Sequence, residues 1–191
     1  MGEPIVEWLN QQQDNMMELL RDIVDIDSNS FDKAGVDRVG ARLTAFFDDN
    51  EIPHETIPLE EYGDAIRAVV SGGDGNQPIL LCGHRDTVFP TGEVEKRPFS
   101  IADGKAFGPG VADMKPGLVI NAFILAAFHK FGGHPNPLVG LFTGDEEIGS
   151  PASQDVITAE AEKARLAFNS EPSRPSGNIV TRRKGGIFCH C

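Results

Sequence analysis

The chain has 191 residues, enough to bury a sizeable hydrophobic core in one domain or slightly more. Its formal net charge is -12, with 29 Asp and Glu residues against 17 Lys and Arg residues. This balance leaves no basic surface of the kind that neutralises nucleic acids or anionic membranes, so neither partner is expected.

The cysteines and the N-terminus predict a cytoplasmic protein. Cys82, Cys189 and Cys191 are an odd number without the spacing of a disulfide framework, which favours a reducing compartment. The first residues contain no basic segment followed by an apolar core, so no secretory signal is expected. The sequence also lacks the continuous apolar run of roughly 18 residues that a membrane span needs.

Hydrophobic periodicity predicts two helices and two strands in the first 75 residues. Apolar residues that recur every three or four positions predict an amphipathic helix over 4–26 and a second over 33–50. Pro53 and Pro58 bracket an expected edge strand, and residues 65–70, followed by a Gly-rich turn, are expected to form another.

The remaining pattern alternates strands with helices. We expect strands at 79–82, 137–143 and 165–169, helices at 114–131 and 151–163, and a functional loop over 88–112. This order predicts an α/β fold in three layers, a mostly parallel sheet flanked by helices. Residues 178–183 and 186–191 are also expected to be strands.

Histidine and carboxylate side chains recur in loops along this predicted sheet. His84 and Asp86 are two residues apart, so they leave the same side of the chain if the strand continues through them. The other loops contribute Asp113, Glu146 with Glu147, and Glu171. Mixed imidazole and carboxylate donors suit zinc or a related divalent ion.

Each loop also has a structural explanation. A single histidine after a strand is usually structural, and Asp113 before a helix could be an N-cap. Glu146 and Glu147 could be an acidic helix start favoured by the helix dipole, and Glu171-Pro172 an ordinary turn. Four such loops in succession favour a metal site over four separate coincidences.

Four motifs make the sequence recognisable. They are GHRDTV at 83–88, GPGVADMK at 108–115, GDEEIGS at 144–150 and SEP at 170–172. In this order and spacing they closely resemble the dinuclear zinc peptidase family that contains glutamate carboxypeptidase, acetylornithine deacetylase, succinyl-diaminopimelate desuccinylase and aminoacylase.

The resemblance implies a metal site with two Zn²⁺ ions in the full-length protein, for which Co²⁺ or Mn²⁺ could substitute. His84 and Glu171 would bind one metal, Glu147 the other, and Asp113 would bridge them. The resemblance also implies a cis peptide bond between Asp113 and Met114.

The same resemblance assigns catalytic roles to two residues. Asp86 would accept the second ring N–H of His84 and fix its tautomer. Glu146 would be the general base that takes the proton of the attacking water and hands it to the leaving amine.

The implied function is a metal-dependent hydrolase that cleaves an amide or peptide bond next to a carboxylate-bearing amino acid. Glutamate at 171 resembles the carboxypeptidase and deacylase members rather than the aminopeptidases. The sequences at 146–150 and 181–185 favour the glutamate carboxypeptidase branch. Two alternatives stay open: an N-acyl-amino-acid deacylase acting on small N-acyl substrates, and a non-catalytic fragment that binds metal or a partner.

The family members are longer than this chain. We expect residues 1–177 to form the N-terminal part of the catalytic domain and 178–191 to lead into a missing lid and dimerisation domain. The resemblance places the last histidine ligand and a homodimer surface beyond residue 191. The 191-residue chain alone is therefore expected to have one reasonably complete metal site and no peptidase activity. Cys189, His190 and Cys191 could serve as substitute ligands, but a strand is the favoured interpretation.

Overall fold

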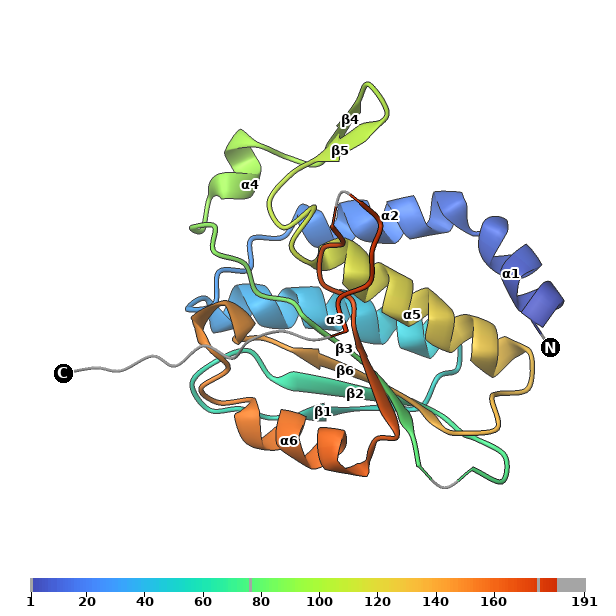
Figure 1. Ribbon diagram of the computed structural model, residues 1–191. Helices are drawn as coiled ribbons and strands as arrows, with labels where there is room; N and C mark the ends of the chain where they lie inside the picture. The colour runs from blue at the N-terminus through green and yellow to red at the C-terminus, as the bar shows by residue number, and fades with distance from the viewer. Residues whose placement is uncertain (1, 76, 175, 182–191) are drawn as a thin grey trace.

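A central sheet organises the chain, as the computed structural model shows for residues 2–75, 77–174 and 176–181 (Figure 1). Within these residues the sheet has five strands in the order β1-β2-β6-β3-β7. In chain order they are β1 (His54–Ile57), β2 (Ala65–Val70), β3 (Ile79–His84), β6 (Leu138–Thr143) and β7 (Leu166–Asn169). All five correspond to strands expected from the sequence.

Helices cover both faces of this sheet. Helices α3 (Lys33–Asp49) and α5 (Lys115–Lys130) lie on one face, and α6 (Gln154–Lys163) lies on the other (Figure 1). Two further helices, α1 (Gly2–Asn10) and α2 (Gln13–Val24), pack on the outer side of α5. The predicted α/β class with three layers is confirmed.

The strand directions divide the sheet into two halves. β1 pairs with β2, and β2 with β6, in antiparallel fashion, whereas β6, β3 and β7 are parallel. The sheet is therefore mixed, and the expected parallel arrangement applies to the β6-β3-β7 half. In this half His84 is paired with Thr143 and Cys82 with Asn169, so the three strands end at one edge. Loops that follow parallel strands meet at such an edge.

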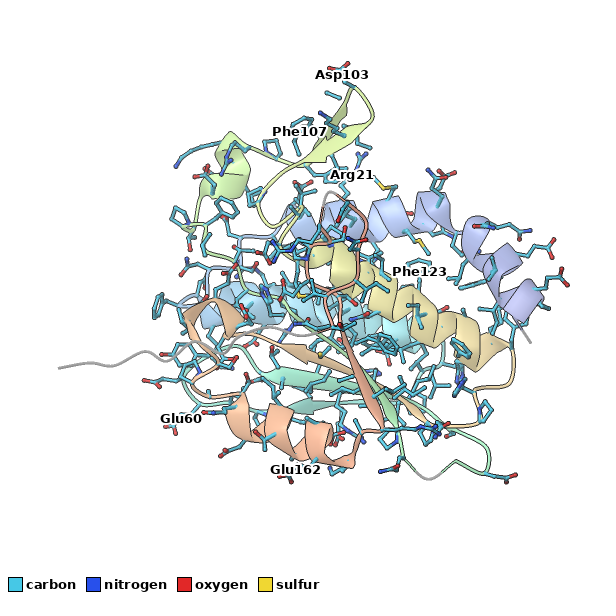
Figure 2. All side chains as sticks on the ribbon, in the orientation of Figure 1. Arg21, Glu60, Asp103, Phe107, Phe123 and Glu162 are labelled. Atoms are coloured by element: carbon cyan, nitrogen blue, oxygen red, sulfur yellow. The ribbon has the colours of Figure 1, made fainter. Side chains whose placement is uncertain are left out.

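The core between the sheet and the helices depends on α5, which is enclosed by the sheet, α1, α2 and α3. This position explains why α5 is apolar on most sides. Phe123 of α5, labelled in Figure 2, has its ring 4.8 Å from that of Phe46 and 6.3 Å from that of Trp8. On the opposite face a smaller cluster joins Leu80 and Val139 to Val156 of α6.

The expected single helix over 4–26 is wrong, because the structure has two helices separated at Gln11 and Gln12. Residues 10–15 read NQQQDN and contain no apolar side chain, so no packing holds this stretch in one continuous helix. The chain turns here instead, with the N–H of Gln11 bonded to the carbonyl of Trp8.

The expected loop over 88–112 also contains regular structure. It holds a short helix, α4 (Glu93–Lys96), and a hairpin of β4 (Ser100–Ala102) and β5 (Lys105–Phe107). Asp103 and Gly104 form its turn with φ of 50° and 71°, the left-handed conformation that Asp-Gly hairpin turns use. Figure 2 shows Asp103 and Phe107 on this hairpin, which projects beyond α2.

The C-terminal expectations are only partly covered by the structure. Residues 178–181 have no strand, unlike the prediction, because they are exposed and form no ladder within the described chain. Residues 182–191, including the expected strand at 186–191 and the Cys189-His190-Cys191 group, lie outside the described residues. In the part of the chain that is described, every helix is too short or too polar to cross a membrane.

We predict that Leu125→Ala lowers the free energy of unfolding by about 2–5 kcal/mol, because Leu125 is fully buried on α5 and its loss leaves a cavity. Ile120→Ala on the same helix is the matched control, since Ile120 is 50% exposed. Urea unfolding of the two variants measures the difference. Equal destabilisation by both substitutions would contradict the position of α5 in the core.

Candidate metal centre

The candidate site residues meet at the edge where the three parallel strands end. His84 is the last residue of β3, and Asp86 follows in the next loop. Glu146 begins a one-turn 3-10 helix, η1 (Glu146–Ile148), soon after β6. Glu171 follows β7, and Asp113 precedes α5. The fold therefore brings together side chains that lie up to 87 positions apart, from 84 to 171.

His84 is the centre of this cluster. Its imidazole is 2% exposed, and its Nε2 atom faces three carboxylates. Nε2 lies 3.3 Å from Asp113 Oδ1, 3.5 Å from Glu171 Oε1 and 3.7 Å from Glu146 Oε2. The three acids come from three separate loops, so the site depends on the whole parallel half of the sheet.

These donors fit a divalent metal ion. Two ligands that are each about 2 Å from a tetrahedral zinc ion are about 3.3 Å apart, which is close to the observed spacing. Nε2 of His84 is buried and lacks a hydrogen-bond partner among the described residues. This nitrogen and the three carboxylates within 3.7 Å of it could together hold a divalent metal ion.

The potential ligand atoms form two overlapping groups. His84, Glu146 and Glu171 form one group, and His84, Asp113 and Glu147 form the other, with all atoms of a group within 4.8 Å of one another. His84 belongs to both groups. The division differs from the one that the family resemblance implies, since Glu146 offers an oxygen together with His84 and Glu171. Every predicted site residue nevertheless lies in this cluster or in contact with it.

Asp86 links His84 to the backbone of the two glutamates and to Ser30. Its carboxylate accepts hydrogen bonds from the backbone N–H of Glu146 and of Glu147, both at 3.1 Å, and from the Ser30 hydroxyl at 2.6 Å. Nδ1 of His84 lies 3.0 Å from the Asp86 backbone carbonyl and 3.3 Å from its carboxylate. Either acceptor places a proton on Nδ1, which leaves Nε2 as the donor atom for a metal.

The charges of the cluster change the pKa values of its members. Burial lowers the pKa of His84, but Asp86 and Glu171 more than offset this effect and raise it to about 11. Burial, reinforced by Glu171, raises the pKa of Asp113. Burial likewise raises the pKa of Glu146, although His84 opposes it. In the metal-free protein His84 is therefore an imidazolium that partly neutralises the surrounding acids.

The structural explanations for these loops hold in part. Met114, not Asp113, is the N-cap residue of α5, so Asp113 does not have the capping role. Glu146 and Glu147 do lie in the first turn of η1, and their carboxylates still reach the cluster. The cis peptide bond expected between Asp113 and Met114 is confirmed.

Two polar residues near the site were not predicted from the sequence. Ser30 and Asn121 are 2% and 0% exposed, and each hydrogen-bonds to a candidate site segment. Asn121 could have been recognised, because it is the one polar side chain among residues 117–128. Ser30 has no such signal, since serines are common in turns.

The chain is similar to known proteins over most of its length. A profile of Peptidase family M20/M25/M40 matches residues 80–184, more than half of the chain. The chain belongs to this peptidase family. The resemblance that the four motifs indicated is therefore confirmed.

Individual relatives support the same assignment. Carboxypeptidase G2 from a Pseudomonas species is 29% identical over 180 residues, which cover 92% of this chain and 43% of that protein. Acetylornithine deacetylase from Salmonella arizonae is 30% identical over 180 residues, 90% of this chain and 46% of the relative. Human carnosine dipeptidase 1 shares the fold with a TM-score of 0.75 and 17% identity, over 90% of this chain and 41% of its own. The chain thus spans less than half the length of these relatives.

We predict that Zn²⁺ binding to the metal-free chain at about pH 8 releases about one proton, because protonated His84 must lose its proton to become a ligand. Zinc affinity should therefore rise with pH. Titration calorimetry in buffers of different ionisation enthalpy measures the released protons. His84→Gln should abolish binding, and His129→Gln, at the end of α5, is the control. A binding heat that is the same in every buffer would contradict the prediction.

Proposed function

We propose that this chain provides a large part of the active site of a zinc-dependent hydrolase that cleaves an amide or peptide bond next to a carboxylate-bearing amino acid. The observation that carries the proposal is the position of His84 Nε2, which is buried and within 3.7 Å of three carboxylates from three loops. Membership of a peptidase family supports the choice of a hydrolytic reaction.

In this proposal His84, Asp113, Glu147 and Glu171 would hold the metal ions, and Asp113 would contribute to both metal sites. When bound, such ions polarise the carbonyl of the substrate and lower the pKa of a water molecule. Asp86 holds the His84 ring in place from the opposite side. Its two backbone contacts keep Glu146 and Glu147 at a fixed position relative to that ring.

Glu146 is the proposed general base. Its side chain is half exposed, so water and substrate can reach it, and its Oε2 atom lies 3.7 Å from His84 Nε2. Burial raises the pKa of its carboxyl group, which makes this group a better proton acceptor than an ordinary glutamate. Glu146 takes a proton from the attacking water and transfers it to the nitrogen that leaves.

Two substrate classes are supported by the relatives. The name carboxypeptidase G2 favours release of a C-terminal amino acid, and acetylornithine deacetylase favours removal of an acyl group from an amino acid. We place a small peptide with a terminal carboxylate first, because the sequences at 146–150 and 181–185 favour the glutamate carboxypeptidase branch. We further propose that the full-length protein is a cytoplasmic homodimer, with its second metal completed by residues that this chain does not contain.

Glu146→Gln, in a protein extended to the length of the relatives, should lower kcat by at least about 100-fold while the zinc content stays unchanged. The amide keeps the shape of the side chain but cannot accept the proton. Glu162→Gln on α6, labelled at the bottom of Figure 2, is the matched control. Retained turnover in Glu146→Gln would refute the assignment of the base. N-acyl glutamates, dipeptides and N-acetylornithine form the substrate panel.

The 191-residue chain alone should bind one Zn²⁺ ion tightly, through His84, Asp113 and Glu171, and should not hydrolyse peptides. The second metal site, at Glu147, would lack a ligand that the rest of the protein supplies. Metal analysis after dialysis, together with the same substrate panel, measures both properties. Two tightly bound ions per chain, or turnover by the isolated chain, would contradict this prediction.

A further inference from the structure

Asn121 is an unusual residue in the largely apolar helix α5. Every other residue from 117 to 128 is glycine or apolar, and the Asn121 side chain is completely buried. A buried amide group is unfavourable unless its donors and acceptors are paired. The partners of Asn121 therefore indicate what this residue does.

Both ends of the Asn121 amide contact the chain beside candidate metal ligands. Nδ2 donates to the carbonyl of Cys82 at 3.2 Å, and Oδ1 accepts from the Ser170 hydroxyl at 2.6 Å. Cys82 lies two residues before His84 on β3, and Ser170 directly precedes Glu171. The backbone N–H of Ser170 also donates to the Cys82 carbonyl, at 3.3 Å. One side chain thus joins the segments that carry His84 and Glu171.

Close packing at this point restricts the same segments. A Cβ atom at Gly117, one turn before Asn121 on α5, would lie 2.2 Å from the Ser170 carbonyl oxygen. A Cβ atom at Gly83 would lie 2.6 Å from Met114 Cε. The helix therefore packs directly against the backbone beside both ligands, and the hydrogen bonds of Asn121 act where little movement is available.

We propose that Asn121 is a positioning residue that, together with Ser170, sets the distance between His84 and Glu171 for metal binding. It does not touch the metal. It fixes the end of β3 and the residue after β7 to the same point on α5. The inference rests on the proposed function, because it requires His84 and Glu171 to bind the same ion.

A purely structural role for Asn121 makes a different prediction. Removing one partner leaves a buried polar group unpaired and destabilises the fold, whereas replacing both partners by apolar groups is close to neutral. Under a structural role, Asn121→Leu combined with Ser170→Ala should restore stability and leave zinc affinity unchanged. Under the proposed role, the double variant folds but binds zinc more weakly than the parent chain.

The test is a set of zinc affinities, measured with Zn²⁺ alone by competition with a chelator, next to the Tm of each metal-free variant. We expect Asn121→Leu, Ser170→Ala and the double variant to lose about tenfold or more in affinity. Ser170→Thr keeps the hydroxyl and should retain the affinity of the parent chain. Ile120→Leu, at an exposed neighbouring position on α5, is the matched control.

The outcomes separate this inference from the proposed function. If the parent chain binds zinc, His84→Gln abolishes binding, and the folded Ser170→Ala and double variants bind as tightly as the parent, the inference is wrong and the metal site stands. If the parent chain does not bind zinc, the proposed function itself fails. Ser170 is only partly buried, so Ser170→Ala is expected to fold even if Asn121→Leu does not.

Discussion

The geometry of the site depends on the hydrogen bonds that the buried carboxylate of Asp86 accepts. This carboxylate is fully excluded from solvent, a position that is unfavourable for a charge unless hydrogen bonds surround it. Burial alone would raise its pKa, but His84 and Ser30 more than offset this and lower it below the ordinary value. The group therefore stays ionised and joins two separate segments, at Ser30 and at η1, to the neighbouring side chain of His84. Loss of this charge would weaken all of these contacts at once.

Arg85, a buried cation, is adjacent to Asp86 in the sequence and points to the opposite side of the chain. Arg85 is 1% exposed, and its guanidinium donates to the backbone carbonyls of Val36, Asp64 and Thr143. Burial lowers the pKa of Arg85 to about 10, so it remains charged at neutral pH. Since successive side chains alternate across the chain, His84 and Asp86 face the site. Arg85 anchors the same stretch to α3, to the residue before β2 and to the end of β6. The loop after β3, which carries the candidate ligand His84 at its start, is thus fixed from both sides.

Much of this arrangement could be predicted from the sequence, and the failures have physical causes. Strands β3 and β6 are apolar runs that end in polar motifs, so their positions and the convergence of His84 with the glutamates follow from the pattern. The break near Gln12 was missed because periodicity continues across a polar gap. The hairpin at Asp103-Gly104 was missed because its strands are only three residues long. Asn121 was missed because hydrophobic periodicity identifies the apolar positions of a helix. It does not indicate which hydrogen bonds a single polar residue among them makes.

The outermost strand of the parallel half has a consequence for the site. In the described chain β7 pairs with β3 along one side, and Leu166 and Phe168 on it are 52% and 54% exposed. This strand leads directly to Glu171. Any segment or partner that covers β7 would restrict the backbone that carries a candidate ligand, so covering the edge and binding metal are thermodynamically coupled. By the reciprocity of coupled equilibria, metal bound at Glu171 would in turn favour whatever packs on that edge.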